Sequence, residues 1–322
     1  GRLKEEVPVA IEAFCKVFMT LPSLVKVDFS DNAFGPIGAK AVFEYLSNAS
    51  CLQELRLNNN GLGPEGGKII GEALSACQLS NKASNRPSAL RKISIGRNRL
   101  ENGSAEALGK AFEAHENIEE VSLYQNGIRP DGIVTLAMSI QKCNSLTYLD
   151  LQDNTFTTHG SKAMANAVAK CPKLRHINFG DCLMGPDGCK SVLEAIFEGD
   201  HPLASNITFL NVQYNEMDEC CAAYLSGKIS LCKNLKHLFL NGNNFKSKGE
   251  AASSILSTLR ILEKEDIVDE WDDMEADIDS DEDEEEDENE DLDIESKAEY
   301  KQTSPHTAEE DGITEKIQNL EI

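Results

Sequence analysis

Seven polar side chains that could recognise another protein lie in short segments containing Asn, Gly or Pro. The segments are 30–36, 58–64, 96–103, 125–130 and 152–156. The candidate binding residues in them are Asp31, Asn59, Arg97, Arg99, Gln125, Arg129 and Asp153. Their amide, guanidinium and carboxylate groups can pair with polar groups of a partner. Because binding residues concentrate on loops, we expect these side chains to form a docking edge.

The chain carries none of the familiar motifs for metal, phosphate or nucleophile chemistry. Segment 61–68 has glycines and a lysine, but not in the order of a phosphate-binding loop. No nucleophile elbow is present, and no Cys/His group has zinc spacing. The six histidines are scattered, and we interpret them as surface or structural residues. We therefore expect no metal and no cofactor of the protein's own, and no enzyme active site.

A hydrophobic repeat that occurs eight times must position these loops. Each copy reads apolar-x-x-apolar-x-apolar-x-x-Asn/Cys. The last positions, called ladder positions below, are Asn32, Asn60, Asn98, Asn126, Asn154, Cys182, Asn215 and Asn243. Such a repeat is typical of a leucine-rich-repeat protein. It predicts an α/β solenoid, a ribonuclease-inhibitor-like horseshoe with a parallel inner sheet and outer helices, which usually serves as a binding surface.

Each repeat predicts a short strand, a ladder residue that hydrogen-bonds the turning backbone, and an outer helix. The helical segments, where apolar residues recur at i, i+3 and i+4, are 39–46, 67–74, 105–112, 133–140, 161–168 and 189–197. Two repeats are longer than the others, so we expect insertion loops at 81–88 and near 201–206. A glycine recurs six residues after most ladder positions and indicates close packing where the helix starts.

The charge of the chain is concentrated near its C-terminus. The sequence has 31 Lys and Arg, 55 Asp and Glu and a net charge of −24. Segment 265–295 holds 21 of the acids and no Lys or Arg, which leaves 34 acids against 31 bases elsewhere. We therefore predict a leucine-rich-repeat domain at 1–264, a disordered acidic segment at 265–295 and a polar linker or tail at 296–322. The absence of a basic stripe disfavours nucleic acid as a partner.

Cysteine use and hydropathy indicate an intracellular protein. Four of the ten cysteines lie 17 residues after a ladder position, a spacing that predicts a buried thiol at each helix end: Cys77, Cys143, Cys171 and Cys232. Neighbouring slots would be roughly 10 Å apart, too far for a disulfide. Neither a signal peptide nor an apolar run long enough for membrane insertion is evident.

The loop sequences resemble the catalytic domain of Ran GTPase-activating proteins. The resemblance covers residue 1 to about residue 244 and continues into the acidic segment. The segments that carry it are 1–8, 30–36, 59–64, 96–104, 125–130 and 149–157. It implies that the chain binds Ran in its GTP form, with or without a Ran-binding protein, and accelerates GTP hydrolysis. GTP and Mg would then belong to the partner GTPase, and the chain would be an activator and not itself an enzyme.

The resemblance also assigns roles to individual residues. The functional arginine of the family falls on Arg2, with Lys4 beside it, and the asparagine near the catalytic glutamine of the GTPase falls on Asn59. Asp31, Arg97 and Arg99 would be docking residues. The family is thought to order the glutamine of the GTPase and not to insert an arginine. A neutral amide suits that role, since it both donates and accepts hydrogen bonds.

Further expectations follow from the family. We expect a monomer that is located in the cytoplasm, or at the cytoplasmic face of the nuclear pore, and that supports nucleocytoplasmic transport. Family members have further repeats before the Gly1-Arg2 stretch, so we expect this chain to be a fragment. The main alternative is a non-catalytic leucine-rich-repeat scaffold or inhibitor whose acidic tail binds basic partners. A histone-binding acidic leucine-rich protein is a second alternative, although such proteins usually have fewer and shorter repeats.

Overall fold

The computed structural model describes residues 6–199, 202–271 and 274, so Arg2 and Lys4 lie outside the described residues. Within this part of the chain, eight strands of three residues each form one parallel sheet in sequence order. The strands are β1 (Lys26–Asp28), β2 (Glu54–Arg56), β3 (Lys92–Ser94), β4 (Glu120–Ser122), β5 (Tyr148–Asp150), β6 (His176–Asn178), β7 (Phe209–Asn211) and β8 (His237–Phe239). Every middle residue is buried and pairs with the middle residue of the next strand, beginning with Val27 and Leu55.

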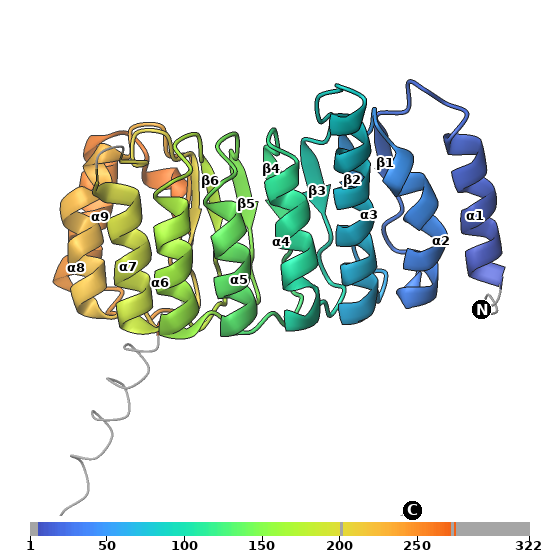
Figure 1. The fold of residues 1–322 in the computed structure, drawn as a ribbon. Coiled ribbons are helices and arrows are strands. Elements are labelled where there is room, and N and C mark those ends of the chain that lie inside the picture. Colours follow the sequence, from blue (N-terminus) through green and yellow to red (C-terminus); the bar gives the residue numbers. More distant parts are fainter. Residues whose placement is uncertain (1–5, 200–201, 272–273, 275–322) are drawn as a thin grey trace, which may run out of the picture. The chain divides into compact units, whose positions relative to one another are not determined.

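The helices cover one face of this sheet and follow one another in chain order (Figure 1). They are α1 (Glu6–Phe18), α2 (Gly35–Asn48), α3 (Gly63–Ala83), α4 (Ala105–Ala114), α5 (Pro130–Ile140), α6 (Thr157–Val168), α7 (Gly185–Phe197), α8 (Glu219–Lys228) and α9 (Glu250–Ile261). The core lies between the two layers, where the apolar stripe of each helix meets the middle residues of the strands. The predicted α/β leucine-rich-repeat solenoid is therefore confirmed.

The ladder residues join neighbouring repeats, as expected. Asn98 is fully buried, and its Oδ1 accepts from the backbone N–H of Asn60 at 2.9 Å. Its Nδ2 donates to the backbone oxygens of Leu57 at 2.9 Å and Ile95 at 3.1 Å. From Asn60 onward, each ladder asparagine thus satisfies backbone groups of two turns that the sheet leaves unpaired, whereas the Asn32 side chain bonds, among the described residues, only its own turn. At Cys182 a thiol takes this place and contacts the oxygen of Leu151 at 3.4 Å.

The prediction of an insertion loop at residues 81–88 is wrong for residues 81–83. Residues 81–83 continue helix α3, which ends at Ala83 and not before the insertion. No proline lies between Pro64, at the start of the helix, and Pro87, and Asn81 in the last turn is almost fully buried. The insertion is therefore shared between an extra turn of helix and a loop.

The predicted domain end at residue 264 also needs correction. Residues 265–271 and 274, which we expected to be disordered, pack on the last repeat. Val268 bridges Leu238 of β8, and the Asp269 carboxylate accepts from the backbone N–H groups of Leu240 and Asn241 at 2.9–3.1 Å. Met274 is 1% exposed. A count of charges alone did not indicate that these residues fold, because the acidic side chains at the start of the segment are interspersed with apolar ones.

Candidate protein-binding site

The predicted binding residues lie together on loops that follow the strands. Backbone hydrogen bonds connect successive loops: Asp31 N–H donates to the oxygen of Asn58, and Asn59 N–H to that of Gly96, both at 2.9 Å. The same pattern continues through Arg97, Gln125 and Asp153. These loops therefore form one continuous edge, which we call the loop rim. Its residues are Asp31, Asn59, Arg97, Arg99, Gln125, Arg129, Asp153 and Asp181.

The backbone turns the rim side chains away from the core. The residue before each ladder position has a positive φ, from 52° at Asn59, Gln125 and Tyr214 to 65° at Gly242. The left-handed region costs most side chains roughly 1–2 kcal/mol. The loops keep it because the buried ladder side chain fixes the turn from inside. Most rim side chains are exposed, and Asp153 is half-buried.

One hydrogen bond links the rim side chains of the first two repeats. The Asn59 side chain donates from Nδ2 to Oδ1 of Asp31 at 2.8 Å. Both residues follow a strand, β1 for Asp31 and β2 for Asn59, and both are exposed. The fold thus brings the candidate catalytic amide next to a candidate docking carboxylate.

Further along the rim, side chains of four repeats surround a hollow of about 510 Å³. Its lining includes Arg99, Gln125, Arg129 and Asp153, all predicted from the sequence. Within the described part of the chain, none of the rim arginines takes part in an ion pair. These guanidinium groups are therefore available to carboxylates or phosphates of a partner.

Sequence reasoning missed two residues of this hollow, Asp181 and Leu183. Burial raises the pKa of the Asp181 carboxyl, and the neighbouring Asp153 carboxylate raises it further. Asp181 stands directly before a ladder position, as Asp153 does. Asp181 was missed because the search for binding residues ended with segment 152–156 and did not include the loop of the next repeat.

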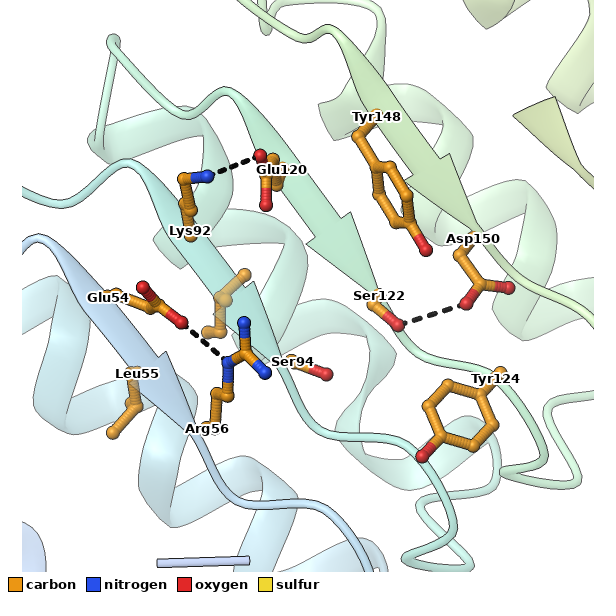
Figure 2. Close-up of a pocket in the computed structure, with 11 residues that line it drawn as sticks. Glu54, Leu55, Arg56, Lys92, Ser94, Glu120, Ser122, Tyr124, Tyr148 and Asp150 are labelled. Atoms are coloured by element: carbon orange, nitrogen blue, oxygen red, sulfur yellow. Dashed lines mark hydrogen bonds and ion pairs between the residues drawn. The ribbon is translucent and has the colours of Figure 1, made fainter. Parts of the chain in front are cut away.

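The face of the sheet opposite the helices carries a smaller pocket of about 210 Å³, shown in Figure 2. Its charged groups are largely paired with one another. Lys92 contacts Glu120 at 2.6 Å, and Arg56 contacts Glu54 at 2.6 Å. Because these charges are already matched, the pocket offers a partner fewer free ionic groups than the rim does.

Asp150 is the one carboxylate of this pocket without an ion pair in the described structure. Burial raises its pKa, and hydrogen bonds from donors such as the Gln152 N–H and the Ser122 hydroxyl only partly oppose that effect. The Ser122 hydroxyl lies 3.2 Å from Oδ2 of Asp150 (Figure 2). Next to it, the rings of Tyr148, His176 and Phe209 stack with centroids 4.0 and 3.9 Å apart. This face therefore combines a buried polar network with an aromatic row.

The rest of the described structure offers little for catalysis by the chain itself. Among the described residues, no group of three or more His, Cys, Asp or Glu side chains could hold a metal ion. All four cysteines that follow the 17-residue spacing are buried and free, as expected. Burial raises the pKa of the Cys143 thiol to about 11 and that of Cys171 to about 12, so both are protonated and unreactive at neutral pH.

None of the described helices is both long and apolar enough to cross a bilayer.

Comparison with known proteins identifies what the repeats and loops are similar to. The sequence model of a family described as "Leucine Rich repeat" matches residues 20–43, 48–71 and 142–165. Ran GTPase-activating protein 1 of Xenopus laevis is 38% identical over 128 residues, which are 39% of this chain and 22% of the relative. Ran GTPase-activating protein 2 of Caenorhabditis elegans is 40% identical over 124 residues, 37% of this chain and 13% of the relative.

A third relative, Ran GTPase-activating protein 1 of Saccharomyces cerevisiae, is 35% identical over 126 residues, covering 39% of this chain and 31% of the relative. The matched segments thus span less than a third of the relatives' own lengths. Among solved structures, an internalin of Listeria monocytogenes aligns with 74% of this chain and 67% of its own at 15% identity, with a TM-score of 0.40. The resemblance to Ran GTPase-activating proteins, seen first in the loop sequences, is confirmed over the matched segments.

Proposed function

We propose that this chain is a GTPase-activating domain that stimulates GTP hydrolysis by Ran. The observation that carries the proposal is the similarity of 35–40% identity to proteins of that one name from three organisms. The rim supports it, since it presents exposed polar groups of the kind that pair with polar groups of a partner. In this proposal the nucleotide and its Mg²⁺ are held by the GTPase, and the chain supplies only protein contacts.

The proposed mechanism orients groups of the GTPase. Phosphoryl transfer to water has a loose transition state, so positioning the attacking water and stabilising charge account for most of the acceleration. Asn59 would contact the catalytic glutamine of Ran and restrict it to the conformation that holds the water. Arg2, with Lys4 beside it, would support the same site, and both belong to the part that the structure leaves undescribed.

The charged rim would hold the GTPase in place. Arg97, Arg99 and Arg129 lie at its middle and form no ion pair with any residue that the structure describes, and Asp153 and Asp181 carry carboxylates beyond them. A partner with the opposite order of charges would therefore dock in one orientation only. We propose that this partner is Ran in its GTP form, alone or with a Ran-binding protein, and that the chain acts as a monomer.

The proposal places the protein in the cytoplasm, or at the cytoplasmic face of the nuclear pore. There it would convert Ran to the GDP form and so support nucleocytoplasmic transport. The alternative of a non-catalytic scaffold predicts binding without any change in the GTP hydrolysis rate, so one kinetic measurement separates the two functions.

The test is single-turnover hydrolysis of GTP bound to Ran, with and without the chain. We expect acceleration by the chain and a loss on the order of 10²-fold for Asn59→Ala, the scale of one oriented transition-state group. Asn85→Ala is a matched control, because Asn85 is also exposed with a positive φ of 54° but follows α3 and not a strand.

Each outcome has a definite meaning. Acceleration that Asn59→Ala abolishes and Asn85→Ala preserves would support the activator. A folded chain that binds Ran without accelerating hydrolysis would overturn the proposal and favour the scaffold. Equal rates for Asn59→Ala and the parent chain would leave the activity but refute the role of Asn59.

A further inference from the structure

The hydrogen bond between Asp31 and Asn59 fixes which way the Asn59 amide faces. An ionised carboxylate only accepts hydrogen bonds, whereas a primary amide donates from nitrogen and accepts at oxygen. The amide must therefore turn Nδ2 toward Oδ1 of Asp31, and it does so at 2.8 Å. Its Oδ1 atom accepts no hydrogen bond from any described residue and is left for a partner.

The backbone holds the two residues in register. Asp31 N–H donates to the oxygen of Asn58, directly before Asn59, and Asn59 N–H donates to Gly96 in the next repeat, both at 2.9 Å. Both residues have a left-handed backbone, with φ of 63° and 52°, which Asp and Asn adopt more readily than most side chains. The carboxylate and the amide thus form a pair fixed by main-chain contacts on both sides.

We propose that Asp31 is a positioning residue that makes Asn59 act as a hydrogen-bond acceptor toward the partner. The group that Asn59 contacts is then a donor, an N–H or O–H such as the NH2 of a glutamine side chain. This inference rests on the proposed GTPase activation, since it specifies the polarity of one contact in that site. Asp31 contacts the partner's reactive group only through Asn59 and is therefore not itself a catalytic residue.

The proposal predicts the behaviour of an exchange of the two side chains. In Asn59→Asp, two carboxylates face each other and repel, so the acceptor loses its fixed position. In the double variant Asp31→Asn with Asn59→Asp, Asn at position 31 donates to Asp at position 59. The other carboxylate oxygen of Asp at position 59 then faces the partner as an acceptor. Asp and Asn have nearly the same size, and both tolerate the left-handed backbone.

The experiment measures the maximal GTP hydrolysis rate on Ran and the half-saturating concentration for each variant. We expect the maximal rate to fall on the order of tenfold in Asp31→Ala and more in Asn59→Asp, because a misplaced group loses most of its effect. The double exchange should recover most of the loss of Asn59→Asp. Asp31→Ala should have no further effect in an Asn59→Ala background. Asp187→Ala, which removes an exposed carboxylate from α7, should behave as the parent chain.

Two results would overturn the inference. One is a maximal rate of Asp31→Ala equal to that of the parent chain; the other is a double exchange no more active than Asn59→Asp. If the parent chain itself fails to accelerate hydrolysis, the proposed function is what fails. Thermal melting of each variant separates misfolding from lost positioning, and the double exchange keeps the test valid if Asp31→Ala does not fold.

Discussion

At the scale of single residues, the ladder side chains set the geometry on which the rim depends. Asn98 is 0% exposed and bonds with backbone groups of both its own turn and the preceding one. Cys182 is equally buried, but its thiol makes only weak contacts at 3.4 Å. The same structural position is therefore held by strong hydrogen bonds in one repeat and mainly by packing in another.

This difference predicts unequal costs of removal. Asn98→Ala leaves several buried backbone groups unpaired, each costing ~1–3 kcal/mol, so we expect a loss of about 3–5 kcal/mol in unfolding free energy. Cys182→Ala removes one sulfur atom from the core, and about 1–2 kcal/mol should be lost. Urea unfolding followed by circular dichroism measures both. Equal losses would show that the ladder acts through packing and not through hydrogen bonds.

At the scale of elements, one buried histidine ties the first insertion to the repeats. His115 follows α4 and is 2% exposed. Its Nε2 lies 2.9 Å from the oxygen of Leu74 in α3, and its Nδ1 lies 2.6 Å from the hydroxyl of Ser88 in the insertion. The carbonyl only accepts, so Nε2 carries the proton and Nδ1 accepts from Ser88 in the neutral ring.

A pH dependence of stability follows. Burial lowers the pKa of His115 below its usual 6.5 and that of His176, on the sheet face, to about 4. The unfolded chain therefore takes up more protons than the folded chain as the pH falls below 6.5. The unfolding free energy contributed by these residues is complete above pH 6.5 and declines toward pH 4.

The measurement is the unfolding midpoint in urea between pH 7.5 and 4.5. We expect His176→Gln to flatten the decline on the acid side, and His115→Gln to flatten it as well while lowering stability at every pH through its lost hydrogen bonds. Other titrating groups are shared by all the proteins, so the difference in slope isolates each imidazole. An unchanged slope in both variants would contradict the assignment.

The elements also show what the sequence could predict. The spacing of residues such as Leu55, Leu57 and Asn60 predicts the strand, the ladder and the start of the helix. It does so because each of these positions is buried in the same way in every repeat. The end of α3 was not predictable in this way, since the insertion departs from the repeat. The packing of Asp269 was missed for a related reason, because its hydrogen bonds to β8 depend on distant residues and not on local pattern.

Part of the candidate site could likewise be predicted from the repeat pattern, and part could not. Position within the repeat was enough to place Asp31, Asn59 and Asp153 on one edge, since the turn after each strand is the same. The hydrogen bond that orients Asn59 depends on side-chain directions, which the repeat pattern does not specify. Asp181 could have been found from its place before the ladder position Cys182, had the search for binding residues continued to that repeat.

At the scale of the whole molecule, the start of the acidic segment belongs to the folded repeats. Asp269 accepts from backbone N–H groups that follow β8, and Trp271 packs edge-on against Phe245 with centroids 5.7 Å apart. Trp271 is the only tryptophan of the chain. These contacts cover the exposed edge that the last strand of a parallel sheet would otherwise present. Intrinsic tryptophan fluorescence therefore reports directly on whether this cap is in place.

Two truncations separate the cap from the acidic charge. A chain ending at residue 274 keeps Asp269, Trp271 and Met274, so we expect its melting temperature and its proposed activation of Ran to match those of the full chain. Charges more than ~8 Å away are screened at physiological salt, so removing the remaining acids should not change the maximal rate. A chain ending at residue 264 loses the cap and should melt several degrees lower, by about 4 °C for each ~2 kcal/mol in a domain of this size.

A large drop in the maximal rate for the chain ending at 274 would assign the acidic residues a direct part in the proposed activation. Equal melting of the two truncations would show that the cap contributes nothing to the stability of the last repeat.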